Sequence, residues 1–251
     1  MLENKKTENY IYGKNAVLEA IDKQSSRINK IFISNNIGHD NRIKRIIELS
    51  KQKSIVVQFT NLNNKNLPKD INHQGVIAYV SPVEYMKFED FLDRMDKKEG
   101  YKKIVILENI QDPHNLGAII RTCACAGFDG VMISNHRACP INMTVEKTSA
   151  GAVNYIPIIK VNSISSAIDT LKDKDWWIIA TSARCEDNYY DIDYTNMNFA
   201  IVMGAEGPGV TKTVMNKADF KVKLPTKFES LNVSTATAVI VYEAIKQIST
   251  V

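Results

Sequence analysis

The sequence predicts an α/β protein with two domains, the larger of which has a mainly parallel sheet covered by helices on both faces. Runs of β-branched residues alternate along the chain with amphipathic segments, which is typical of βαβ units. The chain has 251 residues, enough for two modest domains. A charged, lightly apolar stretch separates two well-patterned blocks. We therefore expect an N-terminal domain over residues 1–80, a linker with one short helix over 81–101, and a C-terminal domain over 102–251.

The first block predicts a small α/β unit. Ala16, Val17, Ala20 and Ile21 recur at helical spacing after the sequence IYGKN. The remaining elements are expected as strands at 31–34, 54–59 and 75–80 and a helix near 43–49. The loop from 61 to 74 is rich in Asn and Lys, which indicates either a solvated connection or an RNA contact.

The second block predicts repeated strand and helix pairs. KIVILENI at 102–110 is a buried strand, QDPHN a turn, and a helix begins at Leu116 and ends at Gly127. Further strands are expected near 131–134, 155–161, 176–183, 199–204 and 219–224, with helices at 163–171 and 210–216. In open parallel sheets, ligands bind beyond the carboxyl ends of strands. The loops 109–115, 181–186, 204–209 and 225–232 are therefore the candidate site.

The last helix has the most regular apolar pattern in the chain. Its apolar stripe is formed by Val233, Ala236, Ile240, Val241, Ala244, Ile245 and Ile248. Asn232 or Ser234 can cap its first turn. Ser230 and Asn232 place polar groups before a helix N-terminus, where they either cap the helix or hold a ligand.

Composition excludes several classes of protein. The 44% hydrophobic and 24% charged residues are typical of a globular protein. No apolar run approaches the roughly 18 residues that span a membrane, and MLENKKTENY lacks a signal-peptide core, so we expect a cytoplasmic protein without membrane contact. The net charge of +4 is compatible with a nucleic-acid partner but does not establish one.

Cysteine and histidine spacing indicates no metal site. Cys123, Cys125, Cys139 and Cys185 form no C-x-x-C pair, so we expect all four to be reduced and mostly buried. The histidines, at 39, 73, 114 and 136, have no acidic or cysteine partner at a ligand spacing.

The sequence MGAEGPG follows a strand directly and favours a ligand without phosphates. Gly204, Gly207 and Gly209 allow a close backbone approach, but their spacing is not G-x-G-x-x-G. Glu206 would also repel a pyrophosphate. S-adenosylmethionine, with its positive sulfonium, fits such a loop better. In the helix that begins at Leu116, Arg121 could either form a salt bridge or bind a phosphate.

Three stretches together resemble the motifs of the SpoU (TrmH) family of RNA ribose 2′-O-methyltransferases in the SPOUT superfamily. They are NLGAIIRT from Asn115, IVMGAEGPG from Ile201 and LPTKFESLNVSTATA from Leu224, within residues 102–247. IYGKNAVLEAI and HQGVIAYV resemble the substrate-binding domain of the RlmB-type members.

The resemblance implies a C-terminal trefoil-knotted domain and a smaller N-terminal substrate-binding domain. It also implies a homodimer, S-adenosylmethionine as cofactor, no metal, and methylation of a guanosine ribose in 23S ribosomal RNA. The implied active-site residues are Asn115, Arg121, Glu206, Ser230 and Asn232. The implied cofactor-binding residues are Gly204, Leu224 and Leu231, with Thr181, Gly207 and Ser230 as further contacts.

One departure and several alternatives remain. The segment 225–230 is about two residues shorter than the family's third motif and lacks its glycine. We expect Arg121 to hold the phosphate and stabilise the developing alkoxide, because its pKa makes it a poor base. The alternatives are methylation of another RNA, such as the transfer RNA D-loop guanosine or an antibiotic-resistance site in ribosomal RNA, and a catalytically silent RNA-binding paralogue.

Overall fold

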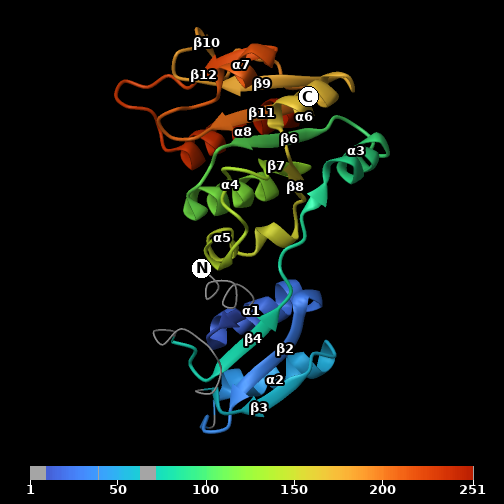
Figure 1. The fold of residues 1–251 in the computed structure, drawn as a ribbon, viewed down its shortest axis with the longest axis vertical. Helices are drawn as coiled ribbons and strands as arrows, with labels where there is room; N and C mark the ends of the chain where they lie inside the picture. The colour runs from blue at the N-terminus through green and yellow to red at the C-terminus, as the bar shows by residue number, and fades with distance from the viewer. Residues whose placement is uncertain (1–9, 39, 63–71, 251) are drawn as a thin grey trace. The chain divides into compact units, whose positions relative to one another are not determined.

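A computed structural model describes residues 10–38, 40–62 and 72–250, which fold as two compact units that divide between Val83 and Glu84 (Figure 1). The first unit contains one sheet with two α-helices. The second contains a larger sheet with helices on both faces. Each unit has its own hydrophobic core.

The first unit is built on a four-stranded sheet in the order β1-β4-β2-β3. Its elements are β1 (Tyr10–Tyr12), α1 (Lys14–Gln24), a 3-10 turn (Ser25–Arg27), β2 (Ile28–Ser34), α2 (Asn41–Gln52), β3 (Val57–Thr60) and β4 (Val76–Val80). Only β2 and β3 pair in parallel. Val17 and Ile21 of α1 and Ile43 and Ile46 of α2 are buried with Ile31 of β2. The predicted helices and strands of this unit are confirmed within the described residues.

The second unit is built on an eight-stranded sheet in the order β10-β12-β9-β11-β6-β7-β8-β5. Its strands are β5 (Met86–Lys87), β6 (Lys103–Glu108), β7 (Gly130–Ser134), β8 (Ile158–Val161), β9 (Trp176–Thr181), β10 (Asp187–Asn188), β11 (Asn198–Gly204) and β12 (Phe220–Lys223). Every pairing in it is parallel, which confirms the predicted parallel sheet.

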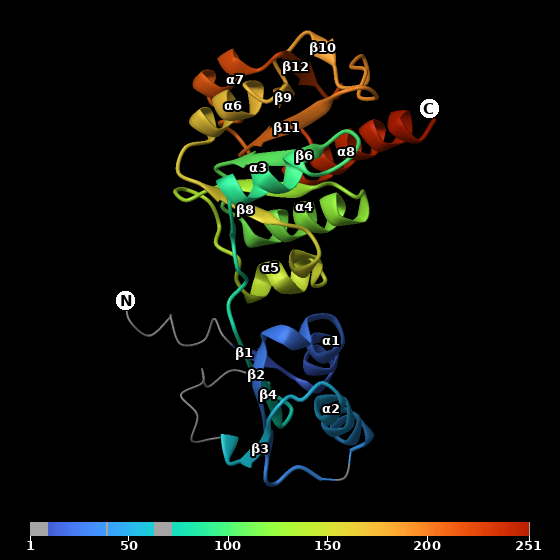
Figure 2. The ribbon, with the colours of Figure 1, turned by 90° about the vertical axis from the view of Figure 1, so that its right-hand side faces the viewer.

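Helices cover both faces of this sheet (Figure 2). The helices α3 (Phe88–Asp96), α6 (Ile164–Lys172) and α7 (Lys212–Lys217) share one core cluster with alternate residues of the strands. The helices α4 (Pro113–Cys125), α5 (Met143–Thr148) and α8 (Val233–Thr250) pack together on the other face, with a 3-10 turn (Ala152–Asn154). The trefoil knot stays a prediction.

Two predicted boundaries are wrong. The α4 helix begins at Pro113, before the expected Leu116, because the Asp112 carboxylate accepts from the His114 amide at 3.0 Å and caps the helix. The α3 helix lies in the expected linker, but its Phe91 and Met95 are buried in the core of the second unit. Residues 84–101 therefore fold with that unit.

The surface differs from the expectations at one cysteine. The four cysteines are free and Cys123 and Cys139 are buried, but Cys125 is exposed, since its position on α4 faces away from the core.

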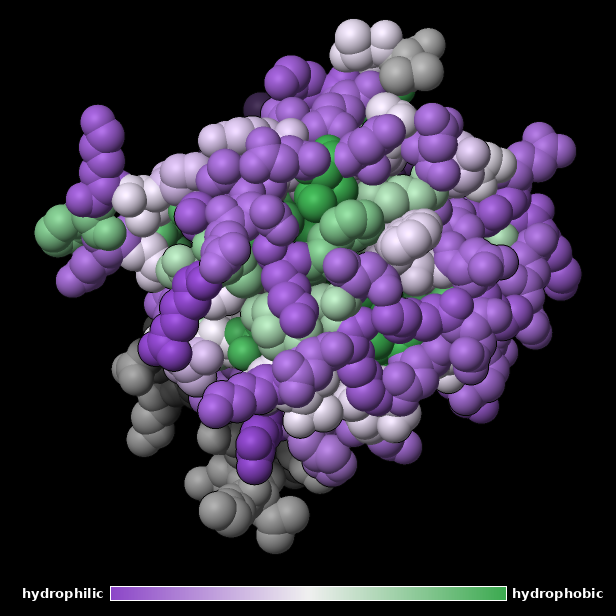
Figure 3. All heavy atoms as spheres, turned by 90° about the horizontal axis from the view of Figure 1, so that it is seen from above, coloured by the Kyte–Doolittle hydropathy of each residue, from purple (hydrophilic) through white to green (hydrophobic). Residues whose placement is uncertain are grey.

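No helix among the described residues combines the length and apolar character needed to cross a membrane. Figure 3 views the end of the second unit that carries β10, β12 and α7, where hydrophilic side chains surround a smaller hydrophobic area.

Candidate active site

Three chain segments meet at one edge of the large sheet. The strands β6 and β11 are parallel neighbours, and Glu108 at the end of β6 pairs with Gly204 at the end of β11. The loops that follow them therefore leave the sheet at the same edge. The third segment is the start of α8, which packs against α4. This edge is where the sequence predicts a site.

The three segments are joined through the side chains of Asn115, Glu206 and Asn232. Oε1 of Glu206 accepts from Nδ2 of Asn232 at 2.7 Å, from Nδ2 of Asn115 at 3.3 Å and from the backbone amide of Val233 at 3.4 Å. Nδ2 of Asn232 also donates to Oδ1 of Asn115 at 2.9 Å. Asn115 is buried, while Glu206 and Asn232 are exposed. Three residues that are distant in sequence therefore form one polar cluster.

The cluster leaves one carboxylate oxygen for a ligand. Oδ1 of Asn232 caps α8 by accepting from the amide of Ser234 at 2.9 Å, so both polar side-chain atoms of Asn232 are used. Oε1 of Glu206 receives three donors, whereas Oε2 of Glu206 has no hydrogen-bond partner among the described residues. An exposed and fixed carboxylate oxygen of this kind attracts a hydroxyl, an amine or a cationic group.

The loop after β11 requires glycine. A Cβ atom at position 204 would lie 2.1 Å from the backbone carbon of Gly209 and 2.2 Å from the nitrogen of Val210. The amide of Gly209 donates to the carbonyl of Ala205 at 2.9 Å, and Gly207 and Gly209 have φ values of +86° and +68°. The loop thus folds back tightly against the end of its strand.

Glu108 anchors the far end of this loop, which the sequence reasoning missed. Its buried carboxylate accepts from the amide of Thr211 at 2.8 Å and from the hydroxyl of Thr211 at 2.9 Å. The sequence signal for this role is an acidic residue at the end of an apolar strand. A carboxylate that is buried there needs hydrogen-bond donors, because burial without them is costly.

The segment between β12 and α8 offers unpaired backbone groups. Residues 224–231 make no backbone hydrogen bond within the part of the chain that the structure describes. Leu224 is half-buried, and the side chains of Phe228 and Leu231 are 88% and 43% exposed. Amides, carbonyls and apolar side chains are therefore available together, which suits a ligand with a heteroaromatic ring.

The other predicted site residues lie outside the cluster. Arg121 is exposed and six residues beyond Asn115, about 240° around α4. It makes no hydrogen bond or ion pair with any described residue, so the salt-bridge alternative finds no partner there. Ser230 is also exposed and unbonded within the described ranges. The buried Thr181 hydroxyl donates to the carbonyl of Val202 at 3.0 Å, so this hydroxyl is already bonded within the protein.

The described residues contain no group of three or more His, Cys, Asp and Glu side chains that could hold a metal ion. His114 and His136 lie in the second unit and His73 in the first. His39 lies outside the described residues.

Family models match both units. The model described as the SpoU rRNA Methylase family matches residues 102–242. The model described as RNA 2'-O ribose methyltransferase substrate binding matches residues 10–86. Both matches cover the stretches on which the sequence resemblance rests.

Individual proteins of known sequence or structure are also similar to this chain. A protein of Staphylococcus epidermidis named for the TrmH family of tRNA/rRNA methyltransferases is 38% identical over 94% of this chain and 95% of its own. The crystal structure of an AdoMet-bound rRNA methyltransferase from Sinorhizobium meliloti covers 98% of this chain and 90% of its own, with a TM-score of 0.74 and 21% identity. A TrmH/SpoU tRNA modifying enzyme from A. aeolicus covers 65% of this chain and 85% of its own, with a TM-score of 0.55 and 30% identity.

Proposed function

Because the chain belongs to the SpoU rRNA methylase family, we propose that it transfers a methyl group from S-adenosylmethionine to a ribose 2′-hydroxyl in ribosomal RNA. The observation that carries this proposal is the cluster of Asn115, Glu206 and Asn232, which joins the three family motifs at one sheet edge. The target within ribosomal RNA that we favour is a guanosine of 23S RNA.

The residues around the cluster suit S-adenosylmethionine. When bound, this cofactor supplies an electrophilic methyl group on a sulfonium. The glycine loop lets backbone come close to the ligand, and residues 224–231 offer unpaired amides and carbonyls. Glu206 adds a negative charge, which is favourable near a sulfonium and unfavourable near a phosphate. We assign Gly204, Gly207, Leu224 and Leu231 to cofactor binding, with the backbone of Thr181 and Ser230 as further contacts.

Methyl transfer requires a ribose hydroxyl that is aligned with the methyl group. Its oxygen bonds to the methyl carbon as the carbon–sulfur bond breaks, and its proton passes to water. The free Oε2 of Glu206 can accept a hydrogen bond from a ribose hydroxyl and orient it. Arg121, which has no protein partner in the described chain, is available to hold the neighbouring phosphate with its planar fork. Its positive charge also stabilises the developing alkoxide.

Ribosomal RNA is favoured over transfer RNA by the first unit. The substrate-binding model matches residues 10–86, and the tRNA modifying enzyme from A. aeolicus covers only 65% of this chain. The name of the Staphylococcus relative includes both RNAs, so transfer RNA remains the second candidate. A resistance site in ribosomal RNA is a further candidate of the same chemistry.

We also propose a homodimer in which two copies of the second unit complete the site. Arg121 lies too far around α4 to meet Asn115 of its own chain directly, and Phe228 beside the site is 88% exposed. A second copy would cover such a side chain and could bring an arginine to the cluster.

Two measurements test the proposed function. Titration calorimetry with S-adenosylmethionine in excess chelator should give saturable heat, and no heat at millimolar cofactor would favour the silent paralogue. Incubation with methyl-labelled cofactor and equimolar unmodified 23S, 16S and transfer RNA transcripts should then label the 23S transcript. Label in transfer RNA alone would contradict the choice of ribosomal RNA.

A further inference from the structure

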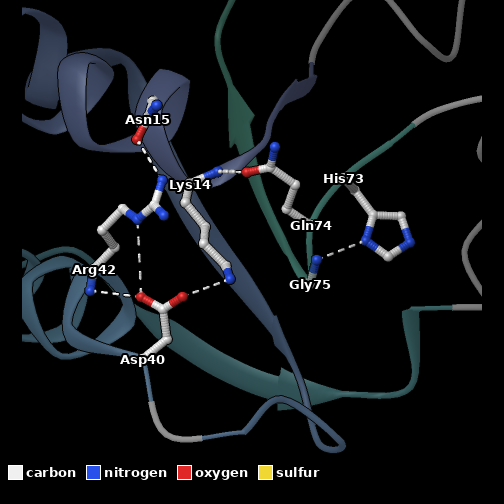
Figure 4. Close-up of polar contacts among 7 residues, drawn as sticks. All are labelled: Lys14, Asn15, Asp40, Arg42, His73, Gln74 and Gly75. Atoms are coloured by element: carbon white, nitrogen blue, oxygen red, sulfur yellow. Dashed lines mark hydrogen bonds and ion pairs between the residues drawn. The ribbon is translucent and has the colours of Figure 1, made fainter.

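The first unit brings together two stretches that the methyl-transfer site does not use. Gly13 to Asn15 begin α1, and His73 to Gly75 precede β4, sixty residues later in the chain. Figure 4 shows that they meet at one corner together with Asp40 and Arg42 from the start of α2. The amide of Lys14 donates to Oε1 of Gln74 at 3.2 Å and links the two stretches directly.

The hydrogen-bond acceptors of this corner are occupied by the protein itself. Besides the bond from Lys14 to Gln74, the amide of Gly75 donates to Nδ1 of His73 at 3.0 Å. Nη1 of Arg42 donates to Oδ1 of Asn15 at 3.2 Å. Each of these donors is an N–H group that cannot accept, so the orientation of both side-chain amides and of the histidine ring is determined.

The single carboxylate of the corner is occupied as well. Oδ2 of Asp40 accepts from Nζ of Lys14 at 2.7 Å, and Oδ1 of Asp40 accepts from the amide of Arg42 at 2.7 Å. The hydrogen bond from Lys14 and that from the Arg42 amide hold the pKa of Asp40 below its ordinary value, so Asp40 is ionised at neutral pH. Two cations and one anion leave the corner with a net positive charge.

The side-chain groups of these residues that have no bonding partner among the described residues are therefore donors. They are Nδ2 of Asn15, Nε2 of Gln74, the Nε2–H of His73, and the unused N–H groups of Lys14 and Arg42. The side chain of Arg42 is 55% exposed and that of Lys14 is 18% exposed. A surface with several neighbouring donors and a positive charge, on which each described side-chain acceptor already receives a donor, is complementary to a ligand rich in anionic and carbonyl acceptors.

We propose that this donor corner, formed by Lys14, Asn15, Arg42, His73 and Gln74, is where the first unit binds the substrate RNA. The groups bound are a backbone phosphate and the acceptor edge of an unpaired base. RNA offers phosphate oxygens, carbonyl oxygens and ring nitrogens within a single nucleotide, and unpaired nucleotides expose all of them. The proposal rests on the proposed function, because it specifies how the substrate of that reaction is held.

Isosteric variants test the donor corner without removing its internal bonds. Gln74→Glu keeps an oxygen for the amide of Lys14 and replaces the outward NH₂ group with an anionic oxygen. Asn15→Asp does the same beside Arg42. His73→Asn keeps an acceptor for Gly75, but its shorter side chain places the NH₂ group closer to the backbone than the Nε2–H group that it replaces. The control is Gln52→Glu, the same chemical change at an exposed position ten residues beyond Arg42 on α2, about 15 Å away.

The full-length variants are compared in filter binding to an unmodified 23S transcript, with melting temperature and S-adenosylmethionine affinity measured in parallel. Gln74→Glu and Asn15→Asp should each weaken RNA binding at least tenfold and His73→Asn about threefold, with the other two quantities unchanged. Gln52→Glu should stay within twofold of wild type. If the three corner variants bind RNA as tightly as Gln52→Glu does, the donor corner is not the RNA-binding site. Methylation of the transcript by the wild-type protein would in that case still support the proposed function. Wild-type protein that neither binds nor methylates the transcript would overturn both.

Discussion

Asn232 shows how one side chain can serve both the fold and the reaction. Its oxygen caps α8, and its two N–H groups hold Asn115 and Glu206. A substitution that preserves the cap and changes only the amide nitrogen separates these two roles. Asp is that substitution, because its second oxygen would face Oε1 of Glu206 at the present 2.7 Å.

We expect Asn232→Asp to lower the methylation rate at least a hundredfold, since like charges in contact repel and Glu206 loses a donor. The cap would remain, so α8 should keep its helicity by circular dichroism. Asn216→Asp, the same change at an exposed position on α7, should be neutral in both measurements. Equal turnover in the two variants would remove Asn232 from the active site.

Arg121→Ala should leave the melting temperature and cofactor affinity close to wild type, because Arg121 has no bonding partner in the described chain. Its turnover should fall by two or more orders of magnitude, or about 3 kcal/mol of transition-state stabilisation. Arg121→Lys should recover little, because an ammonium lacks the bidentate fork. A lower melting temperature with full turnover per folded molecule would show a structural role instead.

At the residue scale, the sequence predicted the members of the polar cluster but not its geometry. Asn115, Glu206 and Asn232 follow from the motifs, whereas Glu108 does not, because its role depends on a hydroxyl and an amide that are 103 residues away. The sequence pattern does not predict the donor corner either, because its hydrogen bonds join residues of three separate segments.

At the element scale, the loop after β11 depends on Gly204. In Gly204→Ala the new Cβ would overlap the backbone of Gly209 and Val210, so the loop must move. We expect S-adenosylmethionine affinity to fall at least tenfold in calorimetry. Gly100→Ala is the control, because Gly100 has φ +72° and open space around it and lies just before the start of β6, at the opposite end of that strand from Glu108. It should cost about 1 kcal/mol of stability and leave cofactor affinity unchanged, and equal affinities in both variants would contradict the assignment of this loop.

Local patterns predicted most elements and failed where side chains act at a distance. The buried strands β6, β9 and β11 follow from short, nearly continuous apolar runs, which are typical of strands buried on both faces of a parallel sheet. The start of α4 was misplaced because DPHN is compatible with both a turn and a capped first turn. The charged residues of α3 mask the apolar face that Phe91 and Met95 bury, and the sequence pattern therefore predicts a linker with a short helix there.

At the scale of the whole molecule, we expect RNA binding by the first unit to be separable from cofactor binding by the second. A chain starting at Glu84 retains β5, α3 and every element of the active site, so it should fold and bind S-adenosylmethionine while losing most RNA affinity. A chain starting at Lys102 loses Phe91, Leu92 and Met95 from the core and should be much less stable to urea. Full RNA affinity in the Glu84 chain would contradict the role of the first unit.

The knot is implied by family resemblance alone, and the dimer by that resemblance together with the exposed Phe228 and the position of Arg121. Helical and strand periodicities describe local burial, and a knot or a subunit interface depends on how distant segments pass one another. Analytical ultracentrifugation decides the oligomeric state directly.

Ribose 2′-O-methylation of ribosomal RNA by this protein is tested most directly by mapping the methylation of that RNA in cells. Ribose methyl groups protect the neighbouring phosphodiester from alkaline cleavage, so the sites can be read along the whole molecule. In a strain that lacks this gene, one 23S ribose should lose its protection, and the intact gene should restore it while the Arg121→Ala gene does not. An unchanged methylation pattern across ribosomal RNA, with a ribose methyl group lost from a transfer RNA, would contradict the claim.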